Sequence, residues 1–121
     1  MAERPVILVV DDDAPILLLM RNLLREFGFD PVTAASGQQA LEEARKRTPD
    51  LILLDRNMPG MTGDEVLCAM RSEGALSSVP VFMLTGEPMD PAEIRTLGAT
   101  GAVMKPFDVS ALVQMIRAHV S

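Results

Sequence analysis

Apolar and polar residues follow two alternating patterns along this chain of 121 residues. One pattern is a short run rich in Val, Ile and Leu with turn residues beside it, which is typical of strands buried on both faces. The other repeats apolar residues at the three- and four-residue spacing of an amphipathic helix. Strands are predicted at Pro5–Val10, Phe29–Ala34, Leu51–Leu54, Pro80–Thr85 and Ala102–Lys105.

The stretches between these strands predict five helices. Ser36 and Thr62 are each followed three residues later by Gln or Glu, which is the pattern of a capping box. The predicted helices cover about Ala14–Phe27, Ser36–Arg47, Thr62–Met70, a short segment capped by Asp90, and Asp108–Val120. This alternation predicts an α/β fold with a parallel sheet, helices on both faces and right-handed crossovers. Alternation alone leaves the order of the strands open.

Polar residues stand where four of the five predicted strands end. Asp11 and Asp12 follow the first strand, Asp55 follows the third, and Thr85 and Lys105 close the fourth and fifth. The carboxyl ends of parallel strands meet at one edge of the sheet, where ligands bind in open α/β folds. If these strands are neighbours, three carboxylates, one hydroxyl and one ammonium should converge. Taken singly, each residue has a simpler interpretation, such as a helix cap or a solvated charge.

Three carboxylates at one edge would repel one another, and either protonation or a bound cation would relieve the repulsion. A ligand set of oxygen atoms without His or Cys suits Mg²⁺, which keeps several waters. Mg²⁺ beside a carboxylate is suited to phosphoryl transfer, with the carboxylate as the nucleophile. Lys105 would supply a positive charge for a phosphate oxygen, and Thr85 a hydroxyl donor.

The composition of the chain argues against several other functions. The net charge of −6, with no run of Lys and Arg, argues against direct binding of nucleic acid. The apolar run Val6–Val10 is too short for a membrane span or a signal peptide. The single cysteine, Cys68, cannot form an internal disulfide, which favours a cytoplasmic location. Its place among apolar residues of a predicted helix favours a small core residue.

Several motifs together resemble the receiver domain of bacterial two-component response regulators. They are Val9–Asp12, Leu54-Asp55 with Met58-Pro59 and Gly63, Leu84–Gly86, and Lys105–Phe107. The resemblance implies one receiver domain over residues 1–121, similar to the chemotaxis regulator. Its flavodoxin-like fold would be a five-stranded parallel sheet in the order 2-1-3-4-5, flanked by five helices.

The resemblance also implies a role for each site residue. Asp55 would be the phosphoacceptor, Thr85 the switch hydroxyl and Lys105 the phosphate-binding lysine, and the Lys105–Pro106 bond is expected to be cis. Magnesium would be held by Asp11 through water, by Asp12 and Asp55, and by the backbone carbonyl of Asn57.

Three further positions bear on how the domain would work. In the family, the positions of Asn57 and Glu87 tune how long the phosphoryl group survives, and this pair suggests a labile phosphoaspartate. Ala102 departs from the family, which usually carries an aromatic residue there. Signalling would then use backbone shifts of the fourth helix and its loops, or a different output face.

The implied function is a phosphorylatable signalling domain that helps to catalyse its own phosphorylation and later hydrolysis. A histidine kinase or a histidine phosphotransfer protein would be the donor. Because no effector domain follows Ser121, output is expected through protein contacts of the fourth helix, fifth strand and last helix. The sequence points to a stand-alone domain but is also compatible with a piece of a longer protein.

Two alternatives stay open. One is a metal-dependent phosphohydrolase of small molecules, although Arg56-Asn57 after Asp55 offers no second carboxylate for acid–base catalysis. The other is a docking module that is not phosphorylated.

Overall fold

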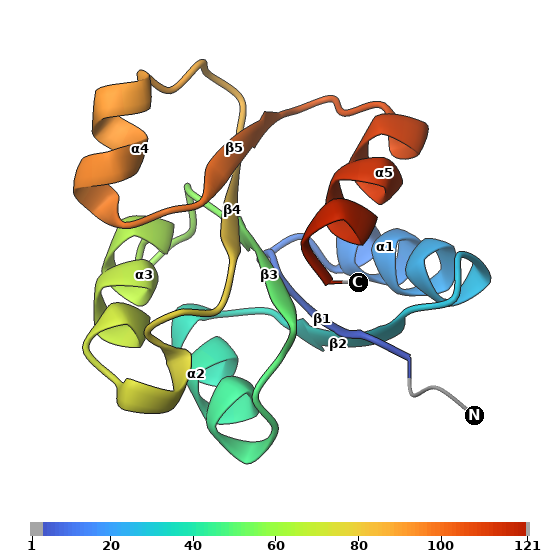
Figure 1. Ribbon diagram of the computed structural model, residues 1–121, viewed down its shortest axis with the longest axis horizontal. Coiled ribbons are helices and arrows are strands. Elements are labelled where there is room, and N and C mark those ends of the chain that lie inside the picture. The colour runs from blue at the N-terminus through green and yellow to red at the C-terminus, as the bar shows by residue number, and fades with distance from the viewer. Residues whose placement is uncertain (1–3, 121) are drawn as a thin grey trace.

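The computed structural model describes residues 4–120, which form five strands and five α-helices. In chain order the elements are β1 (Val6–Val10), α1 (Ala14–Glu26), β2 (Asp30–Ala34), α2 (Gly37–Lys46), β3 (Leu51–Asp55), α3 (Gly63–Arg71), the 3₁₀ turn η1 (Gly74–Leu76), β4 (Val81–Thr85), α4 (Pro91–Leu97), β5 (Gly101–Met104) and α5 (Val109–Val120). The strands are parallel and lie in the order β2-β1-β3-β4-β5, as predicted (Figure 1).

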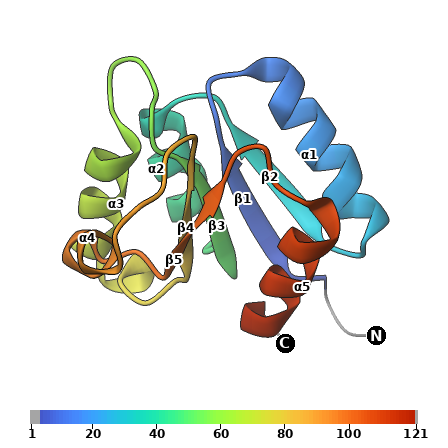
Figure 2. The same cartoon turned by 90° about the horizontal axis from the view of Figure 1, so that it is seen from above.

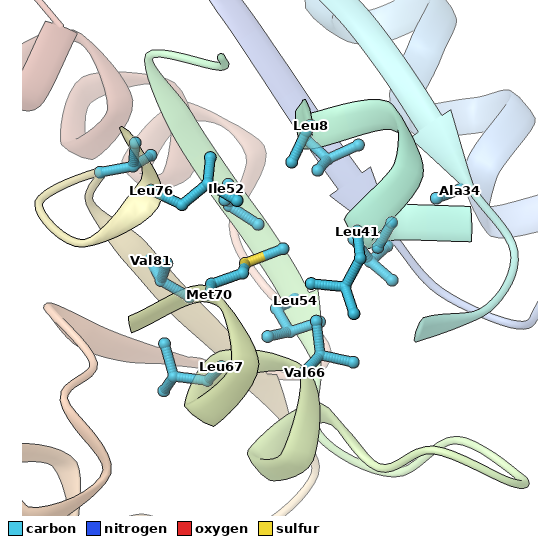
Figure 3. Packing of buried hydrophobic residues seen from close by; sticks show 14 of the residues in the cluster. Leu8, Ala34, Leu41, Ile52, Leu54, Val66, Leu67, Met70, Leu76 and Val81 are labelled. Carbon is cyan, nitrogen blue, oxygen red and sulfur yellow. The ribbon is translucent and has the colours of Figure 1, made fainter. Parts of the chain in front are cut away.

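The sheet lies between two layers of helices. Helices α1 and α5 cover one face, and α2, α3 and α4 cover the other (Figure 2). Every residue of β1, β3 and β4 is buried, which explains why these strands lack the alternation of a half-exposed strand. On the second face, Leu8, Leu54, Val66 and Met70 pack into one cluster that joins β1 and β3 to α3 (Figure 3).

The predicted capping residues start the helices. The Thr62 hydroxyl accepts a hydrogen bond from the Glu65 backbone N–H at 3.2 Å, and the Glu65 carboxylate accepts one from the Thr62 N–H at 2.9 Å. This is a complete capping box. Ser36 caps α2 by accepting a hydrogen bond from the Gln39 N–H. Local hydrogen bonding therefore fixes where α2 and α3 begin.

Two predictions about single elements were wrong. Strand β5 was predicted over Ala102–Lys105 but begins and ends one residue earlier, at Gly101 and Met104. A side chain at position 101 would lie 2.9 Å from the Phe82 ring of β4, so glycine allows the strand to start there. Lys105 consequently follows the strand instead of ending it. Cys68 is exposed, because the inward face of α3 is taken by Val66 and Met70. Within residues 4–120, no helix has the length and apolar character needed to cross a membrane.

The register of the sheet brings the strand ends to one edge. Val10 pairs with Leu54, Asp55 pairs with Leu84, and Thr85 pairs with Met104. The segments after β1, β3, β4 and β5 therefore leave the sheet side by side. This arrangement positions the polar residues described next.

Candidate functional site

An acidic cluster lies at the carboxyl edge of the sheet, formed by Asp11, Asp12 and Asp55. One carboxylate oxygen from each residue lies within 4.8 Å of the other two. Asp11 and Asp55 are only 1% and 6% exposed, whereas Asp12 is exposed to solvent. The cluster is therefore a set of oxygen ligands that is anchored in the core and open on one side.

Lys105 lies against the same cluster from the segment after β5. Its ammonium Nζ is 3.2 Å from Asp11 Oδ2 and 3.3 Å from Asp55 Oδ1. The backbone N–H of Lys105 donates to the Thr85 carbonyl at 2.8 Å, which holds this segment beside β4. The Lys105–Pro106 peptide is cis, as the resemblance implied.

Burial and neighbouring charges shift two pKa values in this cluster. The pKa of Asp55 is raised, chiefly by burial and then by the charge of Asp11, against the opposing effect of Lys105 and of the Asn57 N–H. Burial lowers the pKa of Lys105, but its hydrogen bond to Asp11 and the charges of Asp11 and Asp55 raise it by more. One ammonium thus faces two buried carboxylates, which leaves an excess of negative charge.

The donor set fits a hard divalent cation such as Mg²⁺. All three carboxylates offer oxygen, and the exposed side of the cluster leaves room for the waters that Mg²⁺ retains. Asn57 belongs to the same site, because its N–H donates to Asp55 Oδ1 at 3.3 Å and folds the β3–α3 loop back on the strand end.

Thr85 is buried at the end of β4, but its hydroxyl is engaged elsewhere. It donates to the Glu87 carbonyl at 2.9 Å and accepts from the Glu87 N–H at 3.1 Å. The hydroxyl was expected to converge with the carboxylates, but among the described residues its hydrogen bonds go to Glu87 and not to a carboxylate. Both groups stand at one edge, but Thr85 is bonded to its own loop.

Comparison with known proteins gives the family. The model of the response regulator receiver domain matches residues 7–117, nearly the whole chain. This chain belongs to the receiver domain family of response regulators. Such domains are phosphorylatable signalling domains of two-component systems rather than enzymes in the usual sense, and the family binds Mg²⁺ at an acidic pocket. Response regulators interact with histidine kinases.

Individual relatives agree with this assignment. The chain is 41% identical over 118 residues to the DNA-binding response regulator MtrA of Mycobacterium tuberculosis and to that of Mycobacterium leprae, covering 96% of this chain. It spans about half the length of these curated relatives. Among solved structures, the chemotaxis protein CheY4 of Vibrio cholerae is 35% identical with a TM-score of 0.89, covering 96% of this chain and 98% of CheY4.

The receiver domain also contains an ion-pair network that the sequence did not predict. Arg56 follows Asp55 directly, and its guanidinium pairs with Asp64 of α3 and with Glu93 of α4. These hydrogen bonds to Glu93 and Asp64 raise the pKa of Arg56. The partners are eight and 37 residues away in the chain. No local pattern could have found them, because only the tertiary fold brings the three side chains together.

A hollow of about 460 Å³ opens next to this network. Its lining residues are Arg56, Asn57, Thr62, Asp64, Thr85, Glu87 and Glu93. The receiver domain thus places the residue that follows Asp55, the Thr85 hydroxyl and the first turn of α4 around one space.

The structure explains why glycine stands at position 63, the first residue of α3. A side chain here would overlap the Asp55 carbonyl oxygen and lie 2.8 Å from the Arg56 Cα atom. The Gly63 N–H donates to the Arg56 carbonyl at 3.0 Å. Glycine is required by this close approach of α3 to the end of β3, and its backbone freedom is a secondary matter.

Proposed function

We propose that Asp55 accepts a phosphoryl group from a phosphohistidine donor in a Mg²⁺-dependent reaction. The observation that supports this proposal is the meeting of three carboxylates and the Lys105 ammonium at the carboxyl edge of the sheet. Of the three carboxylates, Asp55 is the one that ends the central strand β3. It contacts Lys105 and accepts a hydrogen bond from the Asn57 N–H.

The transfer exchanges one bond to phosphorus for another. A carboxylate oxygen of Asp55 attacks phosphorus, the P–N bond of the donor breaks, and its electron pair stays on the imidazole nitrogen. The product is an acyl phosphate, which water later hydrolyses to restore Asp55. Lys105 neutralises a phosphoryl oxygen during both steps.

The metal belongs to the acidic cluster in this proposal. Asp11, Asp12, Asp55 and the backbone carbonyl of Asn57 would hold Mg²⁺, which when bound supplies positive charge for the phosphoryl oxygens. The excess negative charge of the cluster supports this assignment. Asn57 and Glu87 border the same hollow as Thr85, which is consistent with an influence on the lifetime of the phosphoryl group.

The proposed partners act on two different surfaces. A histidine kinase or a histidine phosphotransfer protein donates at the open carboxyl edge, and a downstream protein binds the face of α4, β5 and α5. On that face Met104 is 44% exposed. A hollow of about 250 Å³ lies between Ala102, Phe107 and Met115, which supports a protein contact there. Residues 1–121 would form one cytoplasmic receiver domain, and its net charge of −6 supports no direct contact with nucleic acid.

The test is incubation with acetyl phosphate and Mg²⁺, followed by the intact mass of the protein. We expect a gain of one phosphoryl group in the wild type, no gain in the Asp55→Asn variant, and none in the wild type with excess EDTA. An unmodified wild type would support the unphosphorylated docking module instead. Turnover of a small phosphate ester by the wild type would support the phosphohydrolase.

A further inference from the structure

Helix α4 is held to the domain differently from the other four helices. Each of the others buries at least two residues, whereas α4 buries none. Its C-terminal end is fixed by Arg71, whose Nε donates to the Gly98 carbonyl at 2.8 Å. Arg71 also donates to the carbonyls of Leu76 and Val79, so one side chain ties the end of α4 to the segment between α3 and β4. Position and mobility of α4 therefore depend on what holds its N-terminal end.

The N-terminal end of α4 is held by Arg56. Nη2 of Arg56 lies 2.9 Å from Glu93 Oε2 and Nη1 lies 3.4 Å from Glu93 Oε1, in the first turn of α4. Nε and Nη2 also donate to the two carboxylate oxygens of Asp64, at 3.1 and 3.2 Å. Two carboxylates thus share one guanidinium whose side chain is only 24% exposed, and the planar group satisfies both.

The two pairs of Arg56 differ in what they join. Asp64 belongs to the start of α3, which packs directly on the end of β3, because the Gly63 N–H donates to the Arg56 carbonyl. Glu93 belongs to α4, which is linked to β4 through the loop that the Thr85 hydroxyl holds at Glu87. Loss of the two Thr85–Glu87 hydrogen bonds would free this loop and, with it, the start of α4 that carries Glu93. Asp64 lies on α3, outside this loop, and would keep its pair with Arg56.

We propose that the Arg56–Glu93 ion pair is a clasp that holds α4 in its resting position and opens when Asp55 is phosphorylated. The inference rests on the proposed phosphorylation of Asp55. Arg56 is a positioning residue, since its side chain pairs with Asp64 and Glu93 and not with the acidic cluster. The ion pair favours the resting conformation, and the phosphoryl group, through Thr85 and its loop, favours the released one. By reciprocity, opening the clasp must strengthen binding of a phosphoryl analogue at Asp55.

The test compares the wild type with Glu93→Gln, which keeps the size of the side chain and removes its charge. Hydrogen exchange of the amides of residues 86–97 is expected to be about two- to five-fold faster in unmodified Glu93→Gln, the range set by a partly exposed ion pair. The Kd for beryllofluoride with Mg²⁺, a phosphoryl analogue, is expected to fall by a similar factor. Glu93→Asp retains a carboxylate and should lie close to the wild type in both measurements.

Two controls separate the clasp from general effects of charge. Glu73→Gln removes one charge from the exposed Arg45–Glu73 pair on α2 and the segment after α3, and should change neither quantity. In Arg56→Gln, the further change Glu93→Gln should add little, because the pair is already broken. Wild-type exchange and analogue affinity in Glu93→Gln would overturn the clasp alone. A wild type that neither binds the analogue nor becomes phosphorylated would overturn the proposed function and, with it, the opening of the clasp.

Discussion

The Thr85 hydroxyl donates a hydrogen bond to the Glu87 carbonyl and accepts one from the Glu87 N–H, and therefore holds the β4–α4 loop in place. Because the single hydroxyl proton is already donated, Thr85 must leave Glu87 before it can donate to a phosphoryl group on Asp55. We expect Thr85→Ala to become phosphorylated at Asp55 yet to show a smaller change in hydrogen exchange of residues 86–97 on phosphorylation. The measurement is the ratio of exchange rates with and without the phosphoryl group in each protein.

Thr85→Ser is the matched control, because it retains the hydroxyl and should preserve the wild-type change. Ala102 has no ring that could follow the threonine, so the response should contain no side-chain rotation at that position. If Thr85→Ala and the wild type bind a phosphorylation-dependent partner equally well after phosphorylation, the threonine does not transmit the signal.

Helix α3 starts so close to β3 that Gly63 has no room for a side chain. Gly63→Ala would push α3 away from the Asp55 and Arg56 backbone, and we expect a loss of more than about 2 kcal/mol in the free energy of unfolding, as for other overpacked sites. Urea unfolding measures the loss. Gly74→Ala is the control, since a side chain there meets nothing within 4 Å and should change stability by less than about 0.5 kcal/mol. Equal stability of the two variants would contradict the close packing.

The elements were predictable from sequence where local chemistry decides them. Ser36 and Thr62 cap helices by hydrogen bonds to residues three positions away, so their pattern is visible in the chain itself. The start of β5 at Gly101 was not predicted, because the need for glycine there comes from the Phe82 ring on the neighbouring strand. The prediction that Cys68 is a core residue was wrong, because apolar neighbours in sequence do not fix which face of a helix is buried.

The position of the site could be predicted from the sequence, but some of its contacts could not. Asp11, Asp55 and Lys105 lie at the ends of strands that a parallel sheet brings together, and in the structure Lys105 contacts both carboxylates. The orientation of the Thr85 hydroxyl was not predictable, because both Glu87 and Asp55 are compatible with a threonine at the end of β4. The pairs of Arg56 depend on how α3 and α4 pack against the sheet, which no motif in the sequence encodes.

At the scale of the whole molecule, the buried charges at the edge that forms the site lower the stability of the folded state. Asp11 and Asp55 are buried side by side with one ammonium between them. Like charges at this distance disfavour the folded state, and charges buried for function are often kept at the expense of stability. In the absence of Mg²⁺, we therefore expect Asp55→Asn to be more stable than the wild type by on the order of 1 kcal/mol.

Addition of Mg²⁺ should reverse this order, because a cation bound only to the folded state stabilises it by about 2.7 kcal/mol at a hundred times its Kd. Thermal unfolding with EDTA and with saturating Mg²⁺ would measure the change in Tm. The wild type should gain most, while Asp55→Asn and Asp12→Asn, each lacking one ligand, should gain much less. Asp108→Asn changes the net charge equally at the exposed start of α5 and keeps an N-cap residue, so it should gain as much as the wild type. An equal gain in all four proteins would mean that Mg²⁺ acts by screening the net negative charge and is not held by the acidic cluster.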